Sequence, residues 1–497
     1  MASQNPSIIR RIFSFIGKFF KTIRTIIGIV FTGLLIIAIV GMFGDHLPPI
    51  PEKGALYLAP TGILVDQQSY VYPIDTLLAD QAMTNPETLV RDVIDAINTA
   101  AVDDRITHLI IATDYLEAGG IAKLEEISNA LINFKATEKP IIVKLLKDNL
   151  NWKLLLDPEL EFPEAYMRNE IEIENASMKD FLMELIKNLG RNEISTTSLI
   201  TKKIYQAWRT ITNFNLPGKS RKNVEHHYDI GGARGEKLYD IFLDKTHRLY
   251  SCAYWKNDTK TLEEAQQNKI DHIVKKLDIK EGQKILEVGC GWGGMAFDIA
   301  RQKKCEVTGI SLSKNQIEYC KQKAKELNLD NQVKFELMDY REAKGKYDRI
   351  FSVGMFEHVG RKFYNTFFKS MNKLLTDNGI FLLHTIGVVD KPTAPNKFIQ
   401  KYIFPGGICP SFSQIINPIE KTGLIVADTE TLIRHYDKTL ESWLERFLEK
   451  KNEVKDLFDE KFVKMWEFYM ASCAAAFRYR DLVVFQLQIV KNFQSAH

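Results

Sequence analysis

The sequence predicts an α/β protein built mainly on a parallel sheet, and three observations lead to this fold class. Strand-like and helix-like segments alternate from residue 55 to 143, and they alternate again from residue 223 to the end. Such alternation is typical of strand–helix–strand units, which place their strands in parallel. The third observation is a strand at residues 284–288 that runs through a glycine-rich turn into a new helix, which presents backbone N–H groups to a ligand.

Composition limits the number of domains and the kind of partner. A chain of 497 residues suggests two to four domains. The formal net charge is +3, with 45% hydrophobic and 26% charged residues, so nothing predicts a nucleic-acid partner. None of the six cysteines forms a C-x-x-C pair, which argues against zinc and fits free thiols in a reducing compartment. We therefore predict no metal site.

The first residues predict a membrane anchor over residues 1–48. Residues 25–43 carry no charge, and a helix of this length spans roughly 28 Å, close to the hydrocarbon core of a bilayer. A secretory signal would have a shorter apolar region and a clear cleavage site. A buried core helix would seldom lack a polar face over this length. Five basic residues between positions 10 and 24 place the N-terminus in the cytoplasm and the following chain across the membrane.

Three further regions follow this transmembrane helix. Residues 49–143 show strand, helix, strand, helix and strand patterns, which predict a partial α/β fragment. Residues 144–215 are mostly helical, with an interruption at Pro158. Residues 216–497 begin with the basic link "LPGKSRK", return to alternating strands and helices, and contain the ligand loop.

The ligand loop lies in "KILEVGCGWGGMAFDIA", residues 284–300. Glycines allow a tight turn and a close approach of a ligand to the backbone. The start of the helix adds free N–H groups and a partial positive charge. The spacing also satisfies the dinucleotide fingerprint G-x-G-x-x-G, but a nicotinamide cofactor needs an acidic residue at the end of the second strand. That strand ends at Ser311 instead.

Two acidic residues favour a different cofactor. Glu287 stands two residues before Gly289, where it could attract the ammonium group of a ligand. Asp339 follows a third strand, where it could accept a hydrogen bond from an adenine amino group. Together these features predict the loop of an S-adenosylmethionine-dependent methyltransferase, and the alternative is a purely structural glycine turn.

Eight motifs then extend this prediction to a family. They are "HYDIG" (227–231), "YSCAYW" (250–255), "EVGCGWGG" (287–294), "GISLSKNQ" (309–316), "SVGMFEHVG" (352–360), "FLLHTIG" (381–387), "YIFPGG" (402–407) and "HYDKTLESW" (435–443). In these motifs and in their order, the chain from about residue 145 to the end resembles the cyclopropane-fatty-acyl-phospholipid synthases, which include the mycolic acid cyclopropane synthases. Residues 231–236 and Pro163 depart from the family pattern.

The resemblance implies a Rossmann-like, doubly wound methyltransferase sheet with a helical lid. It also implies transfer of a one-carbon unit from S-adenosylmethionine to the cis double bond of an unsaturated phospholipid acyl chain. Attack by the alkene leaves a carbocation, and a base then removes a proton so that a cyclopropane ring closes. The family is understood to use bound bicarbonate as this base, and an ion in an apolar pocket must be fully hydrogen-bonded.

The resemblance also assigns catalytic residues around the bicarbonate. Cys252, Glu357, His384 and Tyr436 would surround the ion, and the backbone N–H of Ile386 would donate to it. Glu357 would accept from the bicarbonate hydroxyl, while His384 and Tyr436 would orient the ion. Each residue has a structural alternative, since a lone cysteine is most often a small buried hydrophobe and a histidine at a strand end is often a core residue.

The cofactor-binding residues follow from the same resemblance, together with Glu287. They are Tyr250 and Ser251 at the methionine end, Gly289 and Gly291 in the loop, Ser311 and Gln316 at the ribose, and Asp339 and Tyr340 at the adenine.

Residues 1–143 resemble the start of signal peptide peptidase A. The matching stretches are "GALYLAPTGILVD", "DDRITHLIIAT" and "ALINFKATEKPIIV". The match ends before the serine and lysine that this family uses for hydrolysis, so we expect no peptidase activity. The basic N-terminus would place the following chain outside the cytoplasm, whereas S-adenosylmethionine is made inside. We expect a membrane-associated protein with a single N-terminal span, its synthase domain at the cytosolic face and its substrate in the bilayer.

Two other functions stay open. One is an S-adenosylmethionine-dependent lipid methyltransferase that leaves a methyl branch without closing a ring. The other is an inactive, membrane-anchored fusion. The sequence allows a homodimer without indicating one.

Overall fold

The computed structural model describes residues 54–67, 86–113, 115–134, 141–147, 150–189, 233–390 and 395–495. The predicted anchor at residues 1–48, the basic link after residue 215 and the motif "HYDIG" lie outside the described residues.

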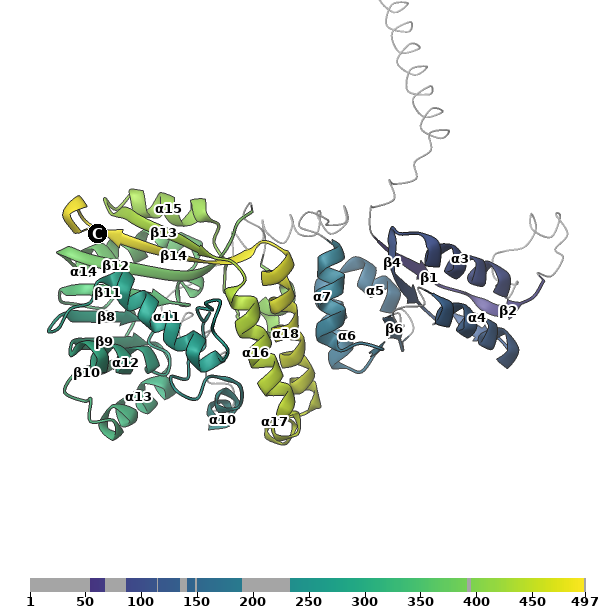
Figure 1. Ribbon diagram of the computed structural model, residues 1–497, viewed down its shortest axis with the longest axis horizontal. Coiled ribbons are helices and arrows are strands. Elements are labelled where there is room, and N and C mark those ends of the chain that lie inside the picture. The colour runs from purple at the N-terminus through teal and green to yellow at the C-terminus, as the bar shows by residue number, and fades with distance from the viewer. Residues whose placement is uncertain are drawn as a thin grey trace, which may run out of the picture. The chain divides into compact units, whose positions relative to one another are not determined.

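A seven-stranded sheet forms the centre of the larger part of the chain (Figure 1). Its strand order is β10-β9-β8-β11-β12-β14-β13, and the first five strands in this order are parallel. β14 lies antiparallel between β12 and β13. The strands are β8 (Lys284–Val288), β9 (Glu306–Ser311), β10 (Val333–Leu337), β11 (Tyr347–Val353), β12 (Leu375–Val388), β13 (Ile425–Leu432) and β14 (Leu482–Val490).

Helices cover both faces of this sheet because its strands are apolar on both sides. Ile285 and Phe351 pack on one face, while the neighbouring residues Leu286 and Ile350 pack on the other. The first face is covered by α11 (Leu262–Leu277), α12 (Gly294–Lys303) and α13 (Lys314–Glu326), and the second by α14 (Tyr364–Leu374) and α15 (Phe412–Glu420). The predicted doubly wound α/β sheet is therefore confirmed.

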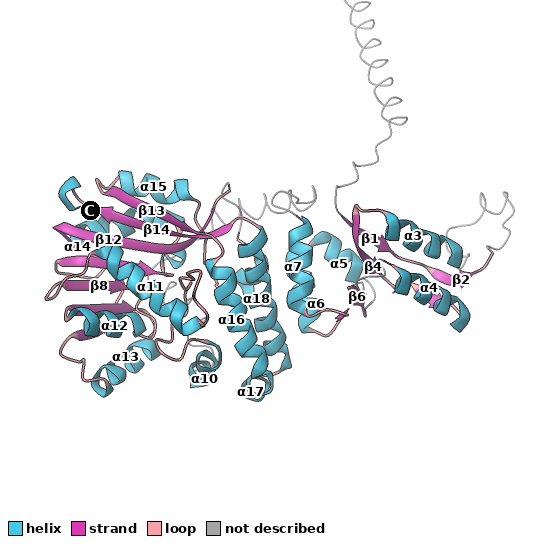
Figure 2. Cartoon of the chain, in the orientation of Figure 1, coloured by secondary structure: helices cyan, strands magenta, loops and turns pink. Residues whose placement is uncertain are grey.

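A group of helices packs beside the sheet around one aromatic core (Figure 2). Tyr239, Phe242, Trp443 and Trp466 are fully buried in it. The helices are α5 (Leu150–Leu156), α6 (Pro158–Met167), α7 (Met178–Leu189), α10 (Ala233–Phe242), α16 (His435–Glu449), α17 (Lys451–Leu457) and α18 (Glu460–Tyr479). As expected, α6 begins at Pro158, and the departing residue Pro163 is buried inside that helix.

The N-terminal described region differs from the single parallel sheet that its sequence predicts. β1 (Gly54–Leu58) pairs in parallel with β4 (Ile106–Ile111), and β2 (Gly62–Val65) pairs separately with β3 (Glu87–Leu89) and β5 (Leu116–Ala118). The helices between them are α3 (Val90–Val102) and α4 (Ile121–Asn133).

β6 (Ile142–Leu145) joins neither of those sheets. It pairs antiparallel with β7 (Ile171–Glu174), which lies in the predicted helical region. β6 therefore spans the predicted boundary at residue 143.

The predicted localisation needs correction. Among the described residues, no helix is long and apolar enough to cross a bilayer. The predicted span at residues 25–43 lies outside that part of the chain. The assignment of a membrane protein with one N-terminal span and a synthase domain at the cytosolic face is therefore not retained.

Candidate active site

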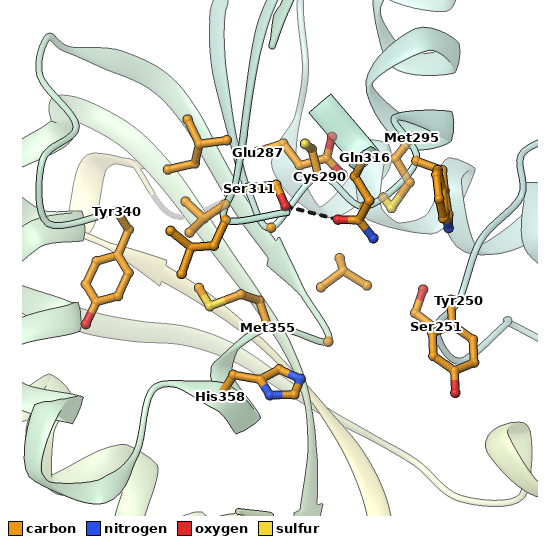
Figure 3. A pocket seen from close by; sticks show the side chains of 18 of the residues that line it. Tyr250, Ser251, Glu287, Cys290, Met295, Ser311, Gln316, Tyr340, Met355 and His358 are labelled. Carbon is orange, nitrogen blue, oxygen red and sulfur yellow. Dashed lines mark hydrogen bonds between the residues drawn. The ribbon is translucent and has the colours of Figure 1, made fainter. Parts of the chain in front are cut away.

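A cavity opens at the carboxyl ends of β8, β9 and β10, and every predicted cofactor residue lines it (Figure 3). This position is where open parallel sheets bind ligands. The predicted residues in its wall are Tyr250, Ser251, Glu287, Gly289, Gly291, Ser311, Gln316, Asp339 and Tyr340. The sequence motifs, which come from separate segments, thus meet at one site.

The turn after β8 needs glycine for two separate reasons. Gly289 has φ +91°, and a Cβ there would lie 2.7 Å from Cβ of Met355. Gly291 has φ +52° and borders open space, where a side chain would fill part of the cavity. Both the backbone conformation and the room for a ligand therefore depend on these glycines.

The next two strands supply polar side chains that already have partners. Ser311 Oγ lies 3.0 Å from Gln316 Oε1, as the dashed line in Figure 3 shows. Asp339 receives hydrogen bonds on both carboxylate oxygens from the Arg341 guanidinium, at 2.7 and 2.6 Å. The predicted adenine acceptor is thus held in place by an arginine that the sequence analysis did not single out.

A buried lysine lies behind the methionine end of this cavity. Lys269 is fully buried on α11, and its Nζ donates to Ser251 Oγ at 2.7 Å. Burial lowers the pKa of Lys269 to about 8, while the nearby carboxylates of Asp244 and Glu287 oppose that shift. Burial raises the pKa of Glu287 well above its ordinary value, and its Oε2 has no hydrogen-bond partner among the described residues.

A second cavity, of about 650 Å³, brings together all five residues predicted to surround the bicarbonate. These residues are Cys252, Glu357, His384, Ile386 and Tyr436. Much of the remaining wall is aromatic or aliphatic, with Phe404, Leu440 and Phe477 among its residues. We call this space the acyl cavity.

The Glu357 carboxylate is held by one oxygen only. Its Oε1 accepts a hydrogen bond of 2.6 Å from the Ile386 N–H, whereas Oε2 is buried without a partner among the described residues. Burial raises the pKa of Glu357 to about 7. The Ile386 N–H was expected to donate to an ion, and in the structure it orients the carboxylate instead.

The imidazole of His384 shows the same pattern. Its Nδ1 lies 3.0 Å from Gln486 Nε2, and its Nε2 is buried without a partner among the described residues. Burial lowers the pKa of His384 well below its ordinary value, so the ring is neutral. With the Gln486 amide as donor, Nδ1 accepts and the ring proton is on Nε2, which is free to donate.

The other two predicted residues are packed firmly in the acyl cavity wall. Cys252 is 1% exposed, and burial raises the pKa of its thiol, so the thiol keeps its proton. The Tyr436 ring lies 4.7 Å from the Phe477 ring, centroid to centroid. Neither residue has the features of a nucleophile, which for cysteine requires a lowered pKa.

The two cavities meet at one place. Tyr250, Ser251, Gly354 and His358 line both of them. The Tyr250 hydroxyl lies 2.9 Å from that of Tyr469, which fixes the ring at the junction. Ligands in the two cavities would therefore be neighbours at this junction.

Comparison with known proteins identifies the family of this chain. Residues 217–487 match the family described as mycolic acid cyclopropane synthetase. The chain belongs to this family. It is also 35% identical to the cyclopropane-fatty-acyl-phospholipid synthase of Escherichia coli strain K12 over 387 residues, which cover 78% of this chain and 94% of the relative. The match covers 387 residues, more than the segment 144–497 contains, so it begins upstream of residue 144.

Solved structures of synthetases agree with the family. The cyclopropane synthase MmaA2 from Mycobacterium tuberculosis superposes with a TM-score of 0.51 at 32% identity, covering 54% of this chain and 97% of that one. The cyclopropane synthase CmaA1, complexed with SAH and CTAB, gives the same values. The chain is thus an S-adenosylmethionine-dependent enzyme with the methyltransferase fold, and S-adenosylmethionine is its methyl donor.

Besides Arg341, sequence reasoning missed two buried residues of this site, Lys269 and Gln486. Each left a signal, because each is a polar residue in a mostly apolar buried segment. Lys269 is aligned with Ala265 and Ile273 on the buried side of α11, and Gln486 interrupts the strand "LVVFQLQIV". A polar group in such a place requires a partner, and each of these side chains contacts a predicted site residue.

Proposed function

We propose that the protein is a cyclopropane-fatty-acyl-phospholipid synthase that acts on the cis double bond of an unsaturated phospholipid acyl chain. One observation carries this proposal. Among the described residues, Glu357 Oε2 and His384 Nε2 are buried without hydrogen-bond partners, and they line a largely apolar cavity that shares residues with the cofactor cavity. Such a pair can hold a small polar guest that accepts the proton lost after methyl transfer.

The residues of the first cavity fit S-adenosylmethionine. Glu287 would face the ammonium group, Ser311 and Gln316 the ribose, and Asp339 and Tyr340 the adenine. When bound, S-adenosylmethionine supplies an electrophilic methyl group. Tyr250 and Ser251 would hold the methionine end at the junction, so that an alkene in the acyl cavity lies in line with the methyl group and away from water.

The second cavity fits a small anion that is also a proton acceptor. An ionised Glu357 Oε2 can accept one hydrogen bond and His384 Nε2–H can donate one, which matches the hydroxyl and the charged oxygen of bicarbonate. Tyr436 would add a hydroxyl donor, and Cys252 would limit the space. Bicarbonate there would supply a base of suitable strength for ring closure.

Bonds, charge and protons balance in the proposed reaction. The alkene forms a C–C bond with the methyl carbon while the S–C bond breaks, and a positive charge remains on the acyl chain. Loss of a proton from the transferred methyl group to the base closes the ring. The rings of Tyr250, Tyr436 and Phe477 line the acyl cavity and can stabilise the cation through their faces. Neutral His384 adds no competing positive charge.

Our expectations for the rest of the chain remain predictions. This proposal does not depend on the boundaries at residues 48, 143 and 215, on the likeness of residues 1–143 to signal peptide peptidase A, or on a homodimer. We assign residues 54–143 no activity.

The test incubates the full chain with methyl-labelled S-adenosylmethionine and dioleoyl phosphatidylethanolamine in non-ionic detergent micelles. Fatty acids are then released and analysed by mass spectrometry. We expect one added CH₂ per reacted chain and loss of alkene reactivity. A product with one added methyl branch would favour the alternative lipid methyltransferase, and S-adenosylmethionine binding without any labelled lipid would favour the inactive fusion.

A further inference from the structure

The acyl cavity extends well beyond the base cluster, to the point where α18 ends and β14 begins. His384 on β12 lies opposite Gln486, and Val388 lies opposite Leu482. Four residues along a strand correspond to about 13 Å, at roughly 3.3 Å per residue. Arg480 precedes Leu482 by two residues and also lines the acyl cavity. This arginine therefore lies just before the start of β14, four residues along the sheet from His384 and two from Ile386.

Arg480 differs from the other arginine near it. Arg478 binds the carboxylates of Asp437 and Glu441. Arg480 is half-buried, and among the described residues its guanidinium has neither an ion-pair nor a hydrogen-bond partner. It is also the one side chain with a permanent positive charge among the described residues that line the acyl cavity.

Because Arg480 is only half-buried and its guanidinium has no protein partner among the described residues, its N–H donors are available to a ligand in the acyl cavity. Its planar array of donors matches the oxygens of a phosphate, to which it can bind through two hydrogen bonds at once. Besides Glu357, three carboxylates line the same cavity, those of Glu159, Asp390 and Asp481. Their negative charge opposes a second anionic group and favours an ammonium group beside the phosphate.

We propose that Arg480 binds the phosphate of a zwitterionic, amine-bearing phospholipid headgroup, whose acyl chain extends along the cavity to the base cluster; this rests on the proposed function. The distances agree. In one leaflet of a bilayer, the middle of an acyl chain lies roughly 10–15 Å from the headgroup layer. The strand register separates the start of β14 from His384 by about 13 Å, and from Ile386, whose N–H holds Glu357, by about 7 Å.

The test compares Arg480→Gln with the wild type on three lipids in the same non-ionic micelles: dioleoyl phosphatidylethanolamine, dioleoyl phosphatidylglycerol and dioleoylglycerol. We expect KM for phosphatidylethanolamine to rise tenfold or more, with kcat changed less than threefold. KM for dioleoylglycerol, which has no phosphate, should not change. Arg301→Gln removes the same charge from the exposed face of α12 and should alter neither constant.

Inorganic phosphate separates a headgroup site from a site for the free ion. If inorganic phosphate competes with phosphatidylethanolamine only above about 10 mM, the result supports a headgroup site. The proposal would be overturned if phosphate competed tightly, Arg480→Gln abolished that competition, and the variant left KM for the lipid unchanged. An equal rise of KM for all three lipids would also overturn it. If the wild type forms no ring on any lipid, the proposed function itself fails, which is a distinct result.

A second variant tests the predicted preference for a headgroup that carries an amine. Wild type should prefer phosphatidylethanolamine to phosphatidylglycerol about tenfold in kcat/KM. Asp481→Asn keeps the backbone carbonyl that accepts from Val389 N–H and removes one negative charge. In this variant, the kcat/KM ratio of phosphatidylethanolamine to phosphatidylglycerol should fall about threefold or more. Equal use of both lipids by the wild type would contradict the predicted headgroup.

Discussion

The cofactor cavity and the acyl cavity are built in different ways from the same chain. Most of the first comes from the ends of three successive strands, between Glu287 and Tyr340. The residues of the second that we propose as catalytic come from four distant segments, which contain Cys252, Glu357, His384 and Tyr436. A cofactor site of this kind is therefore a property of local sequence, whereas the acyl cavity exists only once the whole domain has packed.

The two cavities also differ in how their polar groups are satisfied. In the cofactor cavity, Asp339 is paired with Arg341 and Ser311 with Gln316. In the acyl cavity, Glu357 and His384 each keep one buried atom without a partner among the described residues. A buried polar atom that lacks a partner typically costs about 1–3 kcal/mol. Glu287 Oε2 in the cofactor cavity also lacks a partner there, so each cavity leaves a polar atom for its guest. The adenine and ribose ends of the cofactor cavity are already paired, whereas in the acyl cavity the unpaired atoms belong to two of the proposed catalytic side chains.

The strongest test of this difference is Glu357→Gln. The amide keeps the size of the side chain but cannot become an anion that accepts the guest's hydroxyl proton. General acid–base catalysis contributes roughly 10²–10⁴-fold to a rate, so we expect formation of cyclopropane product to fall at least about 100-fold. Mass analysis of the released fatty acids measures this loss.

The same variant should leave the cofactor cavity intact. Glu357 does not line that cavity, so the Kd for S-adenosylhomocysteine, measured by calorimetry, should change less than about threefold. Unchanged ring formation would show that Glu357 does not support the base. Loss of both activity and cofactor binding would mean that the two cavities are not independent.

Gly289→Ala tests the cofactor cavity. The new Cβ would lie 2.7 Å from Cβ of Met355, at a φ of +91° that L-residues rarely adopt. The turn must shift, and we expect the Kd for S-adenosylhomocysteine to rise tenfold or more, about 1.4 kcal/mol. Gly282→Ala is the matched control, because Gly282 has φ +78° but no atom within 4 Å of the added Cβ.

Calorimetry on both glycine variants separates strain from blockage. Gly282→Ala should destabilise the fold by about 1–3 kcal/mol through backbone strain alone and leave cofactor binding unchanged. If both variants weakened binding equally, global destabilisation rather than the local shape of the loop would be the cause.

The cofactor cavity could be predicted from the sequence in more detail than the acyl cavity, for a physical reason. The glycine turn, Glu287 and the missing acid at Ser311 identify the cofactor from local spacing alone. Nothing local marks Cys252 or Tyr436 as neighbours, and only the family resemblance connected them. The doubly wound sheet followed from the alternation of strands and helices, because its apolar strands leave few other arrangements.

Register and pairing could not be predicted in this way. The N-terminal strands were expected in one parallel sheet, but β6 pairs antiparallel with β7. Short strands such as β3 and β5 carry too few residues to specify a partner. The roles of Lys269 and Ile386 depend on hydrogen bonds across the fold, which spacing along the chain does not encode.

The pH dependence of activity tests the state of Glu357. Its pKa is raised to about 7 by burial, and the ionised form is the one that can accept a hydrogen bond from the hydroxyl of the proposed bicarbonate. Ring formation should therefore rise with pH through about 7 and fall roughly tenfold per unit well below it. Rates of product formation from pH 5.5 to 8.5 measure this, at saturating S-adenosylmethionine. A flat profile below pH 7 would contradict the assigned role.

The smallest expected effect concerns Lys269, which stabilises the junction of the two cavities at an electrostatic cost. Burial lowers its pKa to about 8, so between about pH 8 and its ordinary value the unfolded chain binds more protons than the folded one. Stability must rise with pH over that window. Lys269→Met removes this rise, which amounts to at most about 3 kcal/mol.

Urea unfolding at pH 7.5, 9 and 10 measures that slope. Between the first and last of these pH values, we expect the unfolding free energy of the wild type to rise by about 1–3 kcal/mol more than that of Lys269→Met. Lys275→Met, an exposed position on the same helix, should run parallel to the wild type. A parallel course for Lys269→Met as well would mean that burial does not lower the pKa of Lys269, so that the side chain stays protonated up to its ordinary pKa. In that case Ser251 would be held by an ammonium group whose charge the carboxylates of Asp244 and Glu287 offset.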